Sequence, residues 1–178
     1  MLAQRKGVDK MKEFENKTES IDPIEQISAM ISGWTKDSGT MLPKSTEEIK
    51  QYISNGNSLF VKNGHGEIAG FAAITFDWPD GWKELGAVIV DPEKRENGFG
   101  HKVVKNLINM AVTNFPDSKF FALCNNKSLK LFLDNGAEII KDPNLLPPEV
   151  FGECVNCPHF QEAKSQGKVC CDTPVTIK

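Results

Sequence analysis

The stretch ELGAVIVDPEKRENGFGHKVVKNLINMAVT, residues 84–113, decides the fold of this chain. Residues 84–90 are mostly apolar and β-branched, which predicts a buried strand that the following Asp-Pro pair ends. Apolar side chains then recur at helical spacing over residues 99–111, which predicts a helix packed on a sheet. A strand therefore leads into a helix through a turn that contains Gly98 and Gly100.

This turn is a predicted anion-binding site. The first N–H groups of a helix have no partners within the helix, and they lie at the positive end of its dipole. Glycine lets a phosphate approach the main chain closely. The residues of this turn that are expected to bind the anion are Arg95, Glu96, Asn97, Gly98, Phe99, Gly100 and His101.

Length and composition limit the class of protein. A chain of 178 residues suits one domain, and a net charge of −3 argues against a nucleic-acid-binding protein. No apolar run approaches the ~18 residues of a membrane span, and residues 1–20 are charged, without the apolar core of a signal peptide. We therefore expect a cytosolic protein, with no nucleic-acid or membrane partner, whose five cysteines are kept reduced.

Two helices are expected before the first strand. Asp22-Pro23 is typical of a helix start, and the apolar residues that follow share one face until residues 38–40 break the pattern. The sequence STEE at residues 45–48 is a capping box that begins a second helix, which ends near residue 55. Residues 1–20 bury little apolar surface and are expected to form a flexible arm.

The remaining elements alternate around the central stretch. Strands over residues 59–61 and 68–76 are joined by the hairpin sequence NGHG. Residues 77–82 are expected to form a loop whose two tryptophans either cap the sheet edge or wall a substrate pocket. After the central helix we expect a strand at 120–123, a helix at 128–134 and a strand at 137–140.

The sequence RENGFG at residues 95–100 follows an Arg/Gln-x-x-Gly-x-Gly/Ala pattern directly after Val-Asp-Pro. It resembles the acetyl-CoA pyrophosphate loop of the GNAT acyltransferase superfamily. The resemblance covers about residues 20–145, and the segments GTMLPKS (39–45) and LFLDNGA (131–137) are similar to N-acetylglutamate-synthase-like GNAT domains. It implies an α/β (α+β) GNAT fold, with a mixed, mostly antiparallel sheet, a splayed parallel strand pair and flanking helices.

The resemblance also implies a division of the chain and a place for coenzyme A. Residues 1–20 would be the arm, 21–146 the GNAT domain and 147–178 a cysteine-rich extension. The strands at 84–90 and 119–123 would splay apart. Gly86 either marks the bulge that starts the splay or serves only close packing against a neighbour. The cofactor contacts would come from the glycine turn and from Val88, Ile89, Val90 and Asn126.

Acyl transfer to an amine needs a base, and Glu84 at the start of the central strand is our candidate. Main-chain N–H groups near Ile89 and Val90 would stabilise the oxyanion. Many relatives protonate the leaving thiol with a tyrosine, but this chain has Phe132 in that region. Ser128 is the candidate acid, with Cys124 or water as alternatives.

The extension contains four candidate metal ligands, namely Cys154, Cys157, Cys170 and Cys171. A Cys-x-x-Cys pair followed by two further thiols suits structural zinc, with His159 as an alternate ligand. An iron–sulfur cluster, a disulfide or free thiols would use the same residues.

These features predict an acetyl-CoA-dependent N-acetyltransferase that acts on the primary amine of a small molecule, with an amino acid as the first candidate. Two other functions stay open, a catalytically degenerate CoA-binding module and a protein or peptide N-acetyltransferase. The sequence does not fix the oligomeric state, and a homodimer is one of the arrangements left open.

Overall fold

The computed structural model describes residues 22–38, 41–152, 155, 159–167 and 172–177. The predicted arm at residues 1–20 and the four cysteines proposed as metal ligands lie outside these described residues. Across the described helices, none combines the length and the apolar character needed to cross a bilayer.

One mixed sheet runs through the described part of the chain, with the strand order β1-β2-β3-β4-β6-β5. Its strands are β1 Ser58–Lys62, β2 Ile68–Trp78, β3 Trp82–Val90, β4 Lys119–Cys124, β5 Glu138–Ile139 and β6 Thr173–Ile177. Strands β3 and β4 are parallel, whereas the other neighbouring pairs are antiparallel. This arrangement confirms the predicted mixed sheet with one parallel pair.

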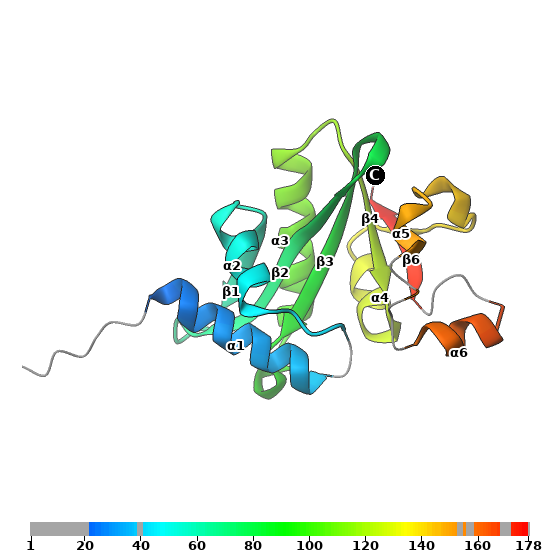
Figure 1. Cartoon of the computed structure of the whole chain (residues 1–178). Coiled ribbons are helices and arrows are strands. Elements are labelled where there is room, and N and C mark those ends of the chain that lie inside the picture. Colours follow the sequence, from blue (N-terminus) through cyan, green and yellow to red (C-terminus); the bar gives the residue numbers. More distant parts are fainter. Residues whose placement is uncertain (1–21, 39–40, 153–154, 156–158, 168–171, 178) are drawn as a thin grey trace, which may run out of the picture.

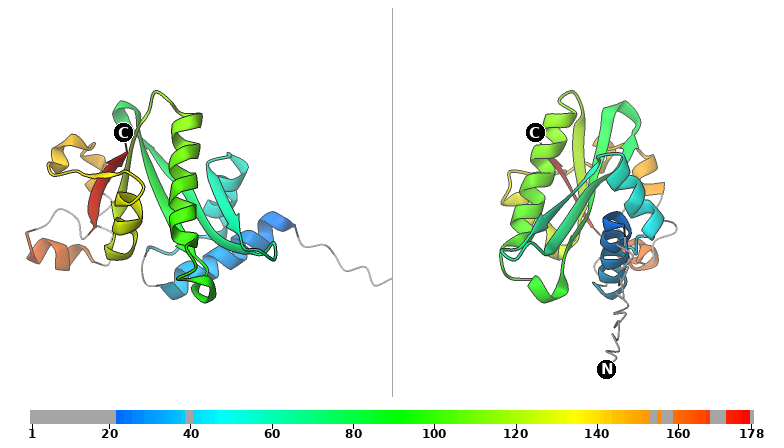
Figure 2. Two further views of the ribbon diagram at one scale, coloured as in Figure 1. Left: turned by 180° about the vertical axis from the view of Figure 1, so that it is seen from behind. Right: turned by 90° about the vertical axis from the view of Figure 1, so that its left-hand side faces the viewer.

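Helices cover both faces of the sheet (Figures 1 and 2). They are α1 Pro23–Ser38, α2 Thr46–Ser54, α3 Phe99–Asn114, α4 Asn126–Leu133, α5 Glu149–Gly152 and α6 Phe160–Ser165, with 3-10 turns η1 Pro79–Gly81, η2 Pro92–Lys94 and η3 Pro143–Leu145. Helices α3 and α4 pack on one face, and α1 and α2 on the other.

Three apolar clusters hold these layers together. The first joins α3 and α4 to the sheet through residues such as Val103, Leu107 and Phe132. The second joins α1 and α2 to the opposite face. The third cluster consists of Phe121, Ile140, Leu146 and Val150, with Trp78, Trp82, Leu123 and Phe151 packed against it. The third cluster attaches the segment after β5 to the sheet beside β4.

The local signals for helix starts and hairpins are confirmed at several places. Ser45 forms the predicted capping box, because its hydroxyl accepts from the Glu48 N–H while the Glu48 carboxylate accepts from the Ser45 N–H. In the hairpin between β1 and β2, the Asn63 side chain accepts the N–H groups of His65 and Glu67. These contacts join residues that are close together in the sequence, so residue order alone could identify them.

The structure departs from the sequence prediction in three elements. The loop expected at residues 77–82 is reduced to η1, because β2 extends to Trp78 and β3 begins at Trp82. Helix α4 begins earlier than expected, since Asn125 alone is its cap and Asn126 is already helical. Strand β6 was not predicted, although it pairs along β4 from Phe120 to Cys124.

Candidate functional site

The parallel strands β3 and β4 form a fork. They pair only at Trp82–Lys119, Lys83–Phe120 and Glu84–Phe121. Beyond Glu84, β4 continues its pairing with β6, and the described residues provide no partner for this side of β3. Figure 1 shows the two strands together at one end and apart at the end where β3 enters the loop before α3. The open side of β3 therefore has backbone groups free to pair with an extended ligand.

A bulge in β3 coincides with the opening of the fork. Opposite β2, the register moves from Phe71–Ile89 to Ala73–Gly86, and Ala87 has a φ of 48°. The bulge therefore lies at Ala87 and Val88, one residue beyond Gly86. A Cβ on Gly86 would lie 3.0 Å from the Thr75 Oγ1 atom, so close packing is the constraint at Gly86.

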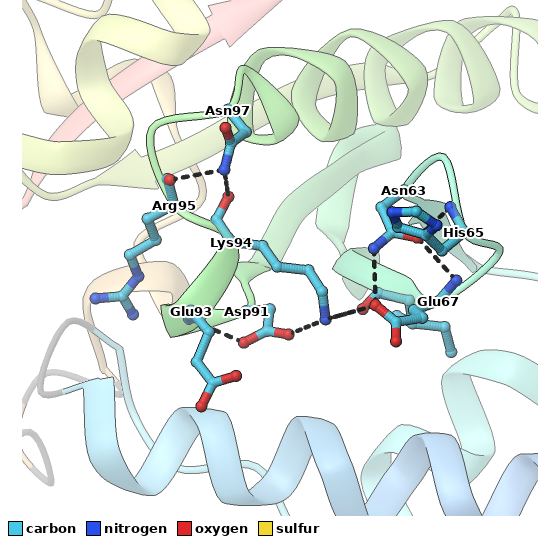
Figure 3. Close-up of polar contacts among 9 residues, drawn as sticks. Asn63, His65, Glu67, Asp91, Glu93, Lys94, Arg95 and Asn97 are labelled. Carbon is cyan, nitrogen blue, oxygen red and sulfur yellow. Dashed lines mark hydrogen bonds and ion pairs between the residues drawn. The ribbon is translucent and has the colours of Figure 1, made fainter.

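The glycine loop between β3 and α3 is held at its base by side chains (Figure 3). The Lys94 ammonium lies 2.6 Å from an Asp91 carboxylate oxygen and 3.6 Å from a Glu67 oxygen in the β1–β2 hairpin. The Asp91 hydrogen bond raises the pKa of Lys94, so this group stays cationic. The Asn97 side-chain amide donates to the carbonyl oxygens of Lys94 and Arg95. The loop therefore keeps its shape without using the backbone N–H groups that follow.

Those N–H groups are open. Within the described residues, no protein acceptor takes the backbone N–H of any residue from Glu96 to His101. Gly98 is the N-cap of α3 with φ 75°, no side chain caps the helix, and a Cβ at Gly98 would meet no atom within 4 Å. This is the geometry that favours an anion at a helix start, because unpaired donors and the helix dipole act together.

Gly100 has a different role in the same motif. A Cβ at Gly100 would lie 3.0 Å from the Leu131 Cδ1 atom on α4. The second glycine of the motif therefore lets α3 and α4 approach closely, which places the start of α4 beside the open end of α3.

Charged side chains flank the open loop. Arg95 is exposed and points away from the Lys94 network (Figure 3). The His101 Nε2 atom lies 3.7 Å from an Asp134 oxygen, and Lys130 lies 2.7 Å from the same oxygen. The hydrogen bond from Lys130, with the charges of Lys130 and His101, lowers the pKa of Asp134. Arg95 is thus the exposed cation that a diphosphate could recruit, whereas His101 already faces a carboxylate.

Glu84 lies at the vertex of the fork, opposite Phe121 of β4 and Phe76 of β2. Its Oε2 atom accepts a hydrogen bond of 3.3 Å from the indole Nε1 of Trp78. Trp78 in turn contacts the Phe76 ring at a centroid distance of 5.6 Å. The carboxylate is therefore half-buried against aromatic groups, and its role as a base stays a prediction.

Polar groups of the α1–α2 connection and of α2 lie on the same side of the sheet as Glu84. Burial raises the pKa of Tyr52, and the nearby Glu48 and Glu84 carboxylates act in the same direction, against the opposing effect of Lys44. Tyr52 is therefore a neutral phenol, able to donate a hydrogen bond. The Lys44 ammonium lies 3.3 Å from Glu48 and 5.8 Å from the Phe76 ring centroid.

A sequence profile of the acetyltransferase (GNAT) family matches residues 27–136, a range that contains the fork, the glycine loop and Glu84. The chain belongs to the GNAT family of acetyltransferases. This finding confirms the family resemblance, and the sheet with its parallel pair confirms the predicted fold.

Comparison with curated proteins gives a partial relative. Over 65 residues the chain is 29% identical to UPF0039 protein C11D3.02c of Schizosaccharomyces pombe. This match covers 36% of the GNAT chain and 43% of the relative, so it spans less than half of the length of that protein.

Several solved structures share the GNAT fold of this chain. N-acetylglutamate synthase from Neisseria gonorrhoeae, complexed with coenzyme A and N-acetyl-glutamate, has a TM-score of 0.58 at 20% identity, covering 85% of this chain and 31% of that one. Rv2747 from Mycobacterium tuberculosis, in complex with CoA, has a TM-score of 0.57 at 18% identity, with coverages of 86% and 92%. Diaminobutyrate acetyltransferase EctA from Paenibacillus lautus has a TM-score of 0.54 at 14% identity, with coverages of 85% and 88%.

The residues considered for the leaving group lie at the start of α4. The Ser128 hydroxyl lies 3.2 Å from the Asn125 Oδ1 atom and 3.4 Å from the Asn125 carbonyl oxygen, so it belongs to the helix cap. Burial raises the pKa of Cys124 to about 12, which keeps the thiol protonated and makes it a weak acid. Phe132 is buried in the first cluster and carries no proton to give. Asn126 is exposed in the first turn. Ser128 and Asn126 stay predictions.

The proposed metal site cannot be placed in the GNAT structure, because all four cysteines lie outside the described residues. In the part of the chain that the structure does describe, no three His, Cys, Asp or Glu side chains gather as metal ligands would.

Sequence reasoning missed two neighbours of Glu84. Trp78 and Glu84 are brought together by the antiparallel register of β2 and β3. Tyr52 comes from α2, far away in the sequence. The predicted hairpin-like order of β2 and β3 could have suggested the first contact, but no local signal points to the second.

Proposed function

We propose that this GNAT protein transfers the acetyl group of acetyl-CoA to the primary amine of a small molecule, with an amino acid as the preferred class of acceptor. The observation that carries the proposal is the combination of the open fork with the open N–H groups at the start of α3. An extended pantetheine arm could pair with the free side of β3 while the loop binds the diphosphate. The fork would thus hold the donor next to Glu84.

Glu84 would accept the proton that the amine loses. In the reaction, the amine nitrogen attacks the thioester carbonyl, the new amide C–N bond forms, and the C–S bond breaks to release coenzyme A. Because Ser128 is engaged in the α4 cap and Cys124 is a weak acid, solvent is the simplest source of the proton for the leaving sulfur. Proximity of the two reactants would supply much of the acceleration.

An amino acid acceptor is supported by the charges around Glu84. The Lys44 side chain is only 15% exposed and lies over the Phe76 ring on the acceptor side. It supplies the cation that a carboxylate of the acceptor would need, in competition with Glu48. Among the structures with the same fold, N-acetylglutamate synthase was solved with N-acetyl-glutamate and EctA with L-2,4-diaminobutyric acid. Glutamate and diamino acids are therefore the first acceptors to test.

The test is release of CoA thiol from acetyl-CoA in the presence of a panel of amino acids, other small amines and peptides. Glu84→Gln should lower kcat/KM at neutral pH by about 100- to 10,000-fold, the range for loss of a general base. It should leave the affinity for CoA unchanged. Glu162→Gln removes an exposed carboxylate of α6 and is the matched control. Full activity of Glu84→Gln across pH would rule out Glu84 as the base.

A second function is favoured by one observation. Phe132 is buried in the region where the family resemblance implies a tyrosine, which favours a CoA-binding module that has lost catalysis. Tight CoA binding by calorimetry together with no thiol release for any amine or peptide would support this second function. Turnover with peptides but not with amino acids would instead identify a protein or peptide acetyltransferase.

A further inference from the structure

The strand pair that carries Glu84 also brings a fixed hydrogen-bond donor to it. In the β2–β3 register, Phe76 is opposite Glu84 and Trp78 is opposite Trp82. Trp78 and Glu84 are therefore diagonal neighbours across an antiparallel pair, a separation that a long aromatic side chain can span. The indole Nε1 of Trp78 lies 3.3 Å from the Glu84 Oε2 atom, and both side chains are partly buried.

The indole is held by packing on its other sides. Trp78 packs against the third cluster, which includes Phe121 of β4 and Leu146 and Val150 from the segment after β5. Its ring also contacts Phe76 at 46° between planes. A donor fixed in this way does not need to reorganise when the carboxylate gains or loses charge.

We propose that Trp78 is a positioning residue for Glu84, because its indole N–H fixes the carboxylate at the vertex of the fork and stabilises the ionised form. This inference rests on the proposed function for its catalytic consequence. A hydrogen bond donated to a carboxylate favours the charged state, which is the state that can accept a proton from the amine. Trp78 thus sets how far into acidic pH the base can work.

Other ionisable groups lie around this strand pair. The Tyr52 phenol of α2 is coupled to Glu84 electrostatically, and Lys44 and Glu48 lie close to Tyr52. Lys119 lies over the Trp82 ring at 5.5 Å from the centroid. The Trp78→Phe substitution leaves these four groups in place and removes the N–H, so any change can be assigned to the indole donor.

The first test does not need activity. The chain contains three tryptophans, and a ¹H–¹⁵N correlation spectrum therefore shows one indole N–H resonance each for Trp34, Trp78 and Trp82. In a pH titration, the Trp78 resonance should shift as Glu84 is protonated, and this shift should vanish in Glu84→Gln. A Trp78 resonance that does not titrate, or that titrates equally in Glu84→Gln, would overturn the proposal even if the chain had no transferase activity.

The second test measures the catalytic consequence. In Trp78→Phe, the acidic limb of the kcat/KM profile should move to higher pH by roughly half a unit to one unit, as expected for loss of one donor to a carboxylate. The matched control is Trp82→Phe, because Trp82 packs edge-on against Phe121 at 5.9 Å and its indole has no hydrogen bond within the described residues. An unchanged profile in Trp78→Phe, or the same shift in Trp82→Phe, would contradict the proposal. Absence of turnover in the wild-type protein would contradict the proposed function instead, and the indole titration would still decide the contact.

Discussion

Helices α3 and α4 each follow one strand of the fork, yet their first turns are built in opposite ways. At α3 the N-cap is Gly98, which has no side chain to bind the N–H groups that follow. At α4 the N-cap is Asn125, whose side chain accepts from the N–H groups of Lys127 and Ser128. One helix start is open to a ligand and the other is closed by the protein itself.

The difference shows that the two helix starts beside the fork have different roles, one suited to ligand binding and the other to stability. A capped helix start has already used its donors, so it contributes stability but little affinity for an anion. An uncapped start keeps its donors for a ligand and loses the stability that a cap would give. The glycine loop is accordingly held from below, by Lys94 and Asn97, instead of by a cap. A diphosphate bound at the start of α3, as proposed, would therefore leave the cap of α4 undisturbed.

The largest effect expected within this comparison comes from a bulky residue at the N-cap of α3. Gly98→Val forces a β-branched residue into a left-handed conformation, at a cost of about 1–3 kcal/mol. Because a Cβ at this position meets no neighbour, the strain falls on the loop conformation itself. We expect the dissociation constant for CoA, measured by calorimetry, to increase about 10- to 100-fold.

Gly56→Val is the matched control for that change. Gly56 has a φ of 68° and equally open surroundings, but it lies in the turn between α2 and β1. The control and Gly98→Val should lower the melting temperature to a similar extent, and only Gly98→Val should weaken CoA binding. Equal CoA affinity in the two variants would show that the start of α3 does not bind the cofactor.

A smaller effect is expected from removing the side-chain cap of α4. Asn125→Ala removes the side-chain acceptor of α4 and should lower the free energy of unfolding by about 1 kcal/mol, as for other helix caps. CoA affinity should stay within twofold of the wild-type value, because the donors proposed to bind the diphosphate belong to α3. Urea unfolding and calorimetry measure the two quantities separately. A large loss of CoA affinity would mean that the start of α4 is part of the cofactor site.

The smallest effect concerns Cys124, the last residue of β4 before this cap. Burial raises its pKa from about 9 to about 12, so the folded protein prefers the protonated thiol more strongly than the unfolded chain does. The resulting stability is complete below the ordinary thiol pKa and is lost as pH rises from about 9 towards 12. Melting temperatures at pH 7.5–10.5 should therefore fall more steeply for the wild type than for Cys124→Ala. Parallel curves would show that burial of this thiol does not contribute.

The sequence predicted those parts of the site that are continuous in the chain. The order of strand, glycine turn and helix from Glu84 to Ala111 was enough to indicate the family, which the profile match confirms, while anion binding by the turn stays a prediction. Turn and cap signals at Ser45 and Asn63 were also local. In each case the interacting atoms are separated by only a few residues, so residue type and spacing carry the information.

Other parts of the site depended on partners that are distant in sequence. Strand β6 was missed because its short sequence becomes a strand by pairing with β4 and β5. The sequence left Gly86 open between a bulge and close packing, whereas the register with β2 places the bulge at Ala87 and Val88, and the contact with Thr75 supports close packing at the glycine.

The sequence by itself determined that a glycine turn starts a helix after a buried strand, because backbone conformation and helix capping depend on near neighbours. The tertiary structure alone decided that this turn lies beside an opened strand pair, that Trp78 donates to Glu84 and that Tyr52 is coupled to it electrostatically. Those relations come from strand register and from packing between layers, which bring together residues that no local pattern connects.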